Sequence, residues 1–164
     1  MMRITYDPIA DLHNWLRIKE KYPDNFTTTP FYPFDKTVVL AKGNLDDIAV
    51  TIDSSTIIKF NNQALALKKA WDQIERQVLQ AIGDYLGTEL VMFDVKVNLT
   101  TAYLMPYNEQ DNWFMVPTHK PLVKQLRCIA HELFHLYQVK SNPTLSQGER
   151  EAEVHKFLRG LKFP

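Results

Sequence analysis

The sequence predicts an α+β fold, with one domain over residues 1–164 and a small, antiparallel-rich sheet that carries helices on one side. Two observations lead to this class. Several long segments repeat apolar residues with the period of an α-helix, and shorter segments alternate apolar and polar residues with the period of a β-strand. The length of 164 residues is sufficient for one domain with a hydrophobic core, and no repeat, low-complexity tract or linker divides the chain.

The composition argues against several classes of protein. Lys plus Arg and Asp plus Glu both number 19, and a net charge near zero argues against nucleic acid or an anionic membrane as the main partner. Cys128 is the single cysteine, which excludes an intramolecular disulfide framework and fits a reducing compartment. The residues from Met1 to Pro8 contain no apolar run, so no signal peptide is expected, and no segment reaches the length of a bilayer span. We therefore expect a cytoplasmic protein without a membrane partner.

The first 60 residues are expected to form a helix followed by a small β-meander. Asp7 reads as the N-cap of the helix, with Pro8 at the first helical position and an end near Pro23. An irregular connection and three strands follow, at 25–34, 37–41, 48–53 and 56–60, where β-branched runs and alternation predict extended structure.

Residues 61–164 are expected to hold the remaining elements of the same domain. A long helix opens at Asn61 and stops at Gly87, a plausible left-handed C′ residue. The further predicted elements are a strand at 91–99, a hairpin of 102–105 with 113–116, a helix at 121–140 and a last helix at 148–160.

The most informative motif is His-Glu-Leu-Phe-His at residues 131–135, which matches H-E-x-x-H inside a predicted helix. His131 and His135 lie about one turn apart on that helix, so their imidazoles can meet on one tetrahedral zinc ion. Glu132 lies beside them, where its carboxylate can take a proton from a zinc-bound water as a general base.

The position of the motif on its helix supports a metal site. A core histidine would share the apolar stripe of the helix, whereas His131 and His135 point roughly the opposite way. Cys128 precedes His131 by three residues and could lie near the metal, but packing within the helix explains it better than ligation does. The stripe itself consists of Leu126, Ile129, Ala130, Leu133, Leu136 and Tyr137.

A hydrolytic zinc site needs a third protein ligand and one open position for water. The last predicted helix offers Glu149, Glu151, Glu153 and His155. Glu151 lies nearest to the apolar stripe of this helix, and a buried carboxylate without a partner would be costly, so Glu151 is the preferred ligand. Glu153 and His155 remain alternatives. His155, one turn after Glu151, could instead orient that ligand.

The motif, fifteen intervening residues and then Glu151-Ala152 resemble the gluzincins, the thermolysin-like zinc metallopeptidases with H-E-x-x-H on one helix and a Glu on the next. The string from Glu149 to Glu153 is also similar to the ImmA/IrrE-type regulatory metallopeptidases. The order of helix, strands, motif helix and glutamate helix is similar to the upper half of a zincin domain. The resemblance implies a zincin-like core at residues 61–164 that binds zinc and hydrolyses peptide or protein substrates.

The chain also departs from these families. The polar residue four positions after the Glu is usually acidic in thermolysin-like enzymes, and here it is His155. Larger gluzincins continue into a second subdomain after the glutamate helix, so the resemblance is closest to minimal gluzincin-like domains. The long metzincin motif is absent, because Gln138 and Ser141 stand where that motif has Gly and His.

These observations predict a zinc metallopeptidase, with zinc held by His131, His135 and Glu151 and with Glu132 as the general base. The resemblance also implies that the strand at 113–116 forms a sheet edge that binds an extended peptide. One alternative is a non-catalytic or degenerate domain that acts as an interaction module, although such a domain would not need Glu132. Another is an SprT-like protease with His155 as the third ligand, which would imply a DNA-linked role.

Overall fold

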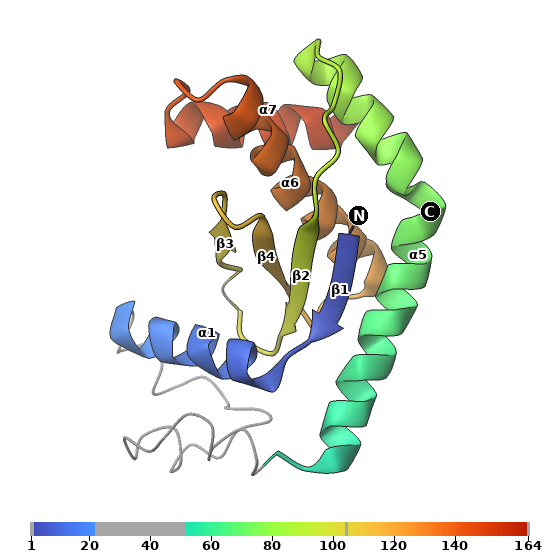
Figure 1. Ribbon diagram of the computed structural model, residues 1–164, viewed down its shortest axis with the longest axis vertical. Helices are drawn as coiled ribbons and strands as arrows, with labels where there is room; N and C mark the ends of the chain where they lie inside the picture. The colour runs from blue at the N-terminus through green and yellow to red at the C-terminus, as the bar shows by residue number, and fades with distance from the viewer. Residues whose placement is uncertain (1, 22–51, 104, 164) are drawn as a thin grey trace.

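The computed structural model describes residues 2–21, 52–103 and 105–163 (Figure 1). The predicted connection at 25–34, the predicted strand at 37–41 and all but the last two residues of the strand at 48–53 lie outside the described residues. The described elements mix helices with a small sheet, as the α+β prediction requires.

The sheet is mixed, and most of its pairing is parallel. Its strands lie in the order β1 (Met2–Tyr6), β2 (Val95–Thr100), β4 (Trp113–Pro117) and β3 (Tyr107–Asn108). Strand β2 pairs in parallel with both β1 and β4, and only the short β3 runs antiparallel, against β4. The prediction of an antiparallel-rich sheet is therefore wrong.

The alternating pattern that suggested antiparallel pairing has a different cause. Parallel strands are usually buried on both faces and are continuously apolar. In β2, Val95 and Val97 enter the core, whereas Lys96 is exposed and Asn98 is half-buried on the opposite face. The alternation along β2 therefore arises because long helices cover one face of the sheet, whereas the other face is partly open.

Strand β1 was not predicted from the sequence, because five residues give little periodicity. Met2, Ile4 and Tyr6 are buried, and they alternate with Arg3 and Thr5. The partner strand β2 lies about ninety residues further along the chain, so no local signal connects the two.

Helix α5 runs over Ser54–Leu86 and flanks β1 on the covered side of the sheet (Figure 1). It includes residues 56–60, so the strand predicted there is wrong. The β-branched run Thr56 to Ile58 favoured a strand, but Phe60 extends the buried helical stripe of Ala64 and Leu67 by one turn. The predicted stop is confirmed, because Gly87 adopts the left-handed conformation with φ of 64°.

Helices α6 (Leu122–Ser141) and α7 (Gln147–Gly160) match the two predicted C-terminal helices to within two residues at each end. Helix α6 packs on β4 and on α5, and α7 packs on α6. Residues 102, 103 and 105, which are the described residues of the predicted strand at 102–105, lie outside any strand, and β3 forms the hairpin with β4 instead. The main core lies between the sheet and α5, α6 and α7, and its fully buried members include Leu67, Trp71, Val97, Leu99, Phe114, Ile129, Phe134 and Val154.

Helix α1 (Pro8–Lys21) borders the other face of the sheet, so the prediction of helices on one side only is wrong for this helix. Asp7 Oδ1 accepts hydrogen bonds from the backbone N–H groups of Ile9 and Ala10, which confirms the predicted N-cap. The buried carboxylate of Asp11 anchors α1 to β2, because it accepts hydrogen bonds from the hydroxyl of Thr100 and from both the backbone and the hydroxyl of Thr101.

Candidate metal centre

The two motif histidines project from the middle of α6 toward α7. His131 Nε2 and His135 Nε2 lie 3.1 Å apart, as expected for side chains one helical turn from each other. His135 is buried and His131 is half-buried. Tetrahedral zinc with bonds of about 2.0–2.1 Å to nitrogen places two such nitrogens about 3.3 Å apart, so the histidine pair fits one ion.

Glu151 of α7 completes the cluster. Its Oε1 lies 3.4 Å from His135 Nε2, and its Oε2 lies 3.7 Å from His131 Nε2. His131, His135 and Glu151 form the group among the described residues whose ligand atoms approach closely enough to hold one metal ion. The preferred ligand set from the sequence is therefore brought together by the fold.

Aromatic packing and a helix cap set the position of Glu151. The rings of Phe134 on α6 and Phe157 on α7 stack with centroids 4.6 Å apart, which holds the two helices together. The start of α7 is fixed by a capping box, in which Ser146 and Glu149 exchange hydrogen bonds. With the start and the packing face of α7 both set, Glu151 is directed to the histidine pair.

The other candidate ligands lie elsewhere. Glu153 Oε2 accepts a hydrogen bond of 2.6 Å from the hydroxyl of Tyr85 on α5. Glu149 is engaged in the cap of α7. His155 is 65% exposed, and its Nε2 lies 4.0 Å from Glu151 Oε2, so it borders the cluster as a neighbour of Glu151. Cys128 is a half-buried free thiol outside the cluster.

Glu132 lies next to the cluster but is not one of its three candidate ligands. Its Oε1 is 3.9 Å from His131 Nε2, and the residue is only 5% exposed. Burial, and then the charge of Glu151, raise the pKa of the Glu132 carboxyl to about 8. A cation bound by the neighbouring ligands would act in the opposite direction and favour the carboxylate.

Burial also keeps the two histidines neutral. It lowers the pKa of His131 to about 4 and lowers the pKa of His135, with the neighbouring His135 adding to the effect at His131. A neutral imidazole has a nitrogen lone pair to offer, so both rings are in the protonation state that metal binding needs at neutral pH.

Gln138 and Tyr107 shape the surroundings of His135. Gln138 Oε1 lies 3.2 Å from His135 Nδ1, and the ring of Tyr107 stacks on the imidazole with an interplanar angle of 14°. Arg150 links the two sides of the site by an ion pair of 3.1 Å with Glu109, which follows β3. None of these four residues was predicted. Of them, Gln138 had a usable signal, because a position three after His135 lies on the same helix face.

The edge of the sheet at the site differs from the expected one. Strand β4, expected to be an edge, pairs with β2 on one side and with β3 on the other. Strand β3 is the last strand in the described sheet, and its Tyr107 lies over His135. The strand nearest to the cluster that could pair with an extended peptide is therefore β3.

A cavity of about 440 Å³ opens directly beside the cluster. His131 and Glu132 form part of its wall, so a molecule in this cavity would lie against the candidate metal centre. The remaining lining residues come mainly from α6 and α7: Met105, Lys120, Lys124, Arg127, Cys128, His155 and Leu158.

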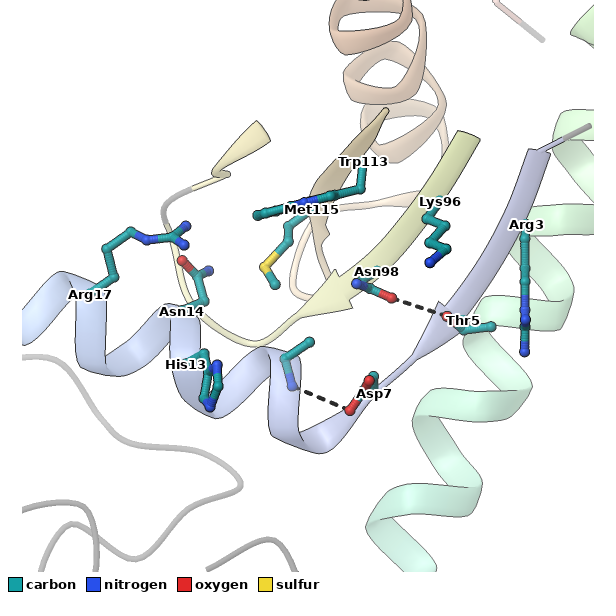
Figure 2. Close-up of a pocket in the computed structure, with 11 residues that line it drawn as sticks. Arg3, Thr5, Asp7, His13, Asn14, Arg17, Lys96, Asn98, Trp113 and Met115 are labelled. Atoms are coloured by element: carbon teal, nitrogen blue, oxygen red, sulfur yellow. Dashed lines mark hydrogen bonds between the residues drawn. The ribbon is translucent and has the colours of Figure 1, made fainter. Parts of the chain in front are cut away.

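A second cavity, of about 410 Å³, lies on the opposite face of the sheet, between α1 and the strands (Figure 2). Arg3, Lys96 and Trp113 enter it from the strands, and His13 and Arg17 enter it from α1. It contains none of the residues of the candidate metal centre, and the core separates the two regions.

Comparison of the chain with protein families, curated proteins and solved structures finds no match. Within the described ranges, no helix has the length and apolar character needed to cross a bilayer.

Proposed function

We propose that this chain is a zinc-dependent peptidase, with His131, His135 and Glu151 as the metal ligands and Glu132 as the general base. One observation carries the proposal. Three potential ligands from two helices converge within bonding range of a single ion, and a buried carboxylate that is not needed as a ligand lies beside them.

The donor set favours zinc. Two imidazole nitrogens and one carboxylate are a common catalytic zinc set, whereas magnesium and calcium prefer oxygen ligands. Three protein ligands also leave a fourth position for water or substrate, which a structural site with four protein ligands does not. When bound there, zinc would supply Lewis acidity, which lowers the pKa of water and polarises a carbonyl group.

The chain's own residues supply the remaining chemistry. Glu132 would take a proton from the water whose oxygen bonds to the carbonyl carbon, and would pass that proton to the nitrogen as the C–N bond breaks, so that the nitrogen leaves as a neutral amine and not as an amide anion. Only 5% of Glu132 is exposed, and its carboxylate lies beside the candidate ligands at the wall of the cavity. Its position outside the ligand group leaves both oxygens available for proton transfer.

A peptide substrate is supported by the neighbouring sheet edge. Extended peptides bind exposed strands through main-chain hydrogen bonds. Strand β3 lies at the end of the described sheet, and Tyr107 from this strand contacts the ring of His135. A peptide paired with β3 would pass close to the metal ligands.

Cleavage of a broad peptide library tests the proposal. The zinc-loaded wild type should cleave peptide bonds, and Glu132→Gln should reduce the rate by at least about 100-fold, the usual contribution of a general base, while zinc and fold are retained. Glu153→Gln is the matched control, because it makes the same substitution outside the cluster and should leave the rate within a few-fold. Equal cleavage by the wild type and Glu132→Gln would contradict Glu132 as the general base, and no cleavage by either protein would favour a non-catalytic binding domain.

A further inference from the structure

We infer that the 440 Å³ cavity beside His131 and Glu132 is a substrate subsite that selects a carboxylate close to the scissile bond. The ligand chemistry is that of an acidic peptide: either an Asp or Glu side chain, or the carboxylate at the end of a peptide. This inference rests on the proposed function and adds the class of substrate to it.

The charge of the cavity wall carries the inference. Lys120, Lys124 and Arg127 line it, at successive spacings of four and three residues, and His131 follows after four more. On α6 these spacings place Lys124, Arg127 and His131 along one face. Lys120 lies just before the start of the helix and lines the same cavity, so the three cations form a row that ends at the metal ligand. Their positive charges would guide and hold an anionic group arriving beside the site.

The acidic groups in and beside the cavity do not neutralise this row. Glu132 is the single acidic residue of α6, and it lies buried beside the histidines. Glu151 faces the histidine pair. Among the described residues, no ion pair involves Lys120, Lys124 or Arg127.

Two cations elsewhere in the described part of the chain differ from this row, because each is neutralised by a nearby carboxylate. Lys68 pairs with Asp72 on α5, and Arg150 pairs with Glu109 near β3. Unneutralised cations beside a reaction centre favour an anionic partner and disfavour a cationic one, because bringing like charges together is unfavourable.

The size and the apolar part of the wall fit a side chain of moderate length. Met105 and Leu158 lie in the same cavity as the cations, so they can contact the aliphatic stem of a Glu residue while its carboxylate meets the positive charges. A basic substrate side chain would find the same apolar contacts but would place its charge against three cations.

Peptide cleavage at low and high salt tests the inference. Matched amidated peptides carry Glu, Gln or Lys at each position within two residues of the cleaved bond, and a second set differs only in having a free C-terminal carboxylate. We expect kcat/KM of the wild type to be about tenfold higher for one of the two carboxylate-bearing sets than for its neutral counterpart. Peptides with Lys should give a lower kcat/KM than the neutral peptides. The preference should shrink at high salt, because these groups are partly exposed.

Charge reversal identifies the residues responsible. Lys124→Glu/Arg127→Glu should abolish or invert the preference while zinc binding is retained. Arg17→Glu/Lys96→Glu changes the net charge equally on the opposite face of the sheet, where both residues are exposed, and should leave the preference intact. A preference for the side-chain set identifies an endopeptidase subsite, and one for the free-carboxylate set identifies recognition of a peptide end.

Binding separates failure of this inference from failure of the proposed function. Fluorescence anisotropy with zinc-loaded Glu132→Gln measures the same labelled peptides without cleavage. If the wild type cleaves peptides with no preference for a carboxylate, the subsite inference is wrong and the peptidase proposal stands. If the wild type cleaves nothing, loss of acidic-peptide binding in Lys124→Glu/Arg127→Glu still supports the subsite. Equal binding of acidic, neutral and basic peptides would overturn the subsite inference. The inference would also be overturned if an oligonucleotide displaced the labelled peptides and the protein showed no preference among them.

Discussion

Gln138 Oε1 lies 3.2 Å from Nδ1 of His135, and both side chains are buried on α6. A side-chain amide oxygen can only accept a hydrogen bond, so this contact makes His135 Nδ1 the donor. The proton therefore resides on Nδ1, and Nε2 presents its lone pair toward His131 and Glu151. One hydrogen bond thus fixes both the tautomer and the orientation of the ring.

Loss of this hydrogen bond should weaken the metal centre without removing a ligand. We expect Gln138→Ala to lower zinc affinity by about 10–100-fold, the usual effect of removing a partner that orients a ligand. Competitive titration with a zinc chelator measures the change. Gln138→Glu keeps an acceptor at the same place and should bind zinc within a few-fold of the wild type or more tightly. Unchanged affinity in Gln138→Ala would show that the contact does not orient His135.

The raised pKa of Glu132 predicts how the metal-free protein responds to pH. In the folded chain Glu132 loses its proton near pH 8, whereas in the unfolded chain it does so near 4.5. Between these values the folded state holds more protons, so this residue makes stability fall as pH rises. Glu132→Gln removes that contribution. We therefore expect the variant to gain stability relative to the wild type between pH 6 and pH 8.

Urea unfolding in the presence of a chelator measures this difference. His131 loses its proton at lower pH, because burial lowers the pKa of this residue in the folded chain to about 4. Its contribution to the pH dependence of stability is therefore complete above the ordinary histidine pKa of about 6.5. The window from pH 7 to pH 8 therefore isolates Glu132. A stability difference between the two proteins that stays constant across that window would contradict the raised pKa.

The Asp11 anchor makes a prediction about stability away from the metal centre. Asp11→Ala removes the acceptor for the hydroxyls of Thr100 and Thr101 and for one backbone N–H group. We expect a loss of about 3 kcal/mol in the free energy of unfolding, because buried donors are left without partners. His13→Ala, at an exposed position on the same helix, should change it by less than about 0.5 kcal/mol. Similar losses in the two variants would contradict the anchor.

Two glycines should respond to alanine with opposite signs. Gly87 ends α5 with φ of 64°, so Gly87→Ala should cost about 1–2 kcal/mol although nothing crowds the new methyl group. Gly148 lies in the first turn of α7 with open space around it, so Gly148→Ala should stabilise by up to about 1 kcal/mol. Thermal unfolding of both variants checks the signs. A stabilising Gly87→Ala would contradict the left-handed stop.

The elements with strong local signals were predicted well. Helix α6 carries a complete apolar stripe, and the H-E-x-x-H spacing placed His131 and His135 together before any tertiary information was used. The stop of α5 followed from Gly87, and the N-cap of α1 followed from Asp7. In each case the signal lies within one or two helical turns of the residue that it predicts.

The features that sequence reasoning missed depend on contacts between distant segments. The parallel pairing of β1 with β2 joins residues about ninety positions apart, and alternation along β2 concealed it because one sheet face is partly open. Tyr107 reaches His135 only through the β3–β4 hairpin. The hydrogen bond from Tyr85 on α5 engages Glu153 and so distinguishes it from Glu151 as a candidate ligand, and no local sequence pattern predicts this contact.

Zinc titration of the wild type and its ligand variants tests the central claim most directly. We predict one zinc ion per chain, lost in His131→Ala and His135→Ala, strongly weakened in Glu151→Ala, and bound with nearly unchanged affinity in Glu153→Ala. Full zinc occupancy in the His131→Ala/His135→Ala double variant would contradict the metal centre. Loss of zinc in His155→Ala, with tight binding retained in Glu151→Ala, would replace Glu151 by His155 as the third ligand.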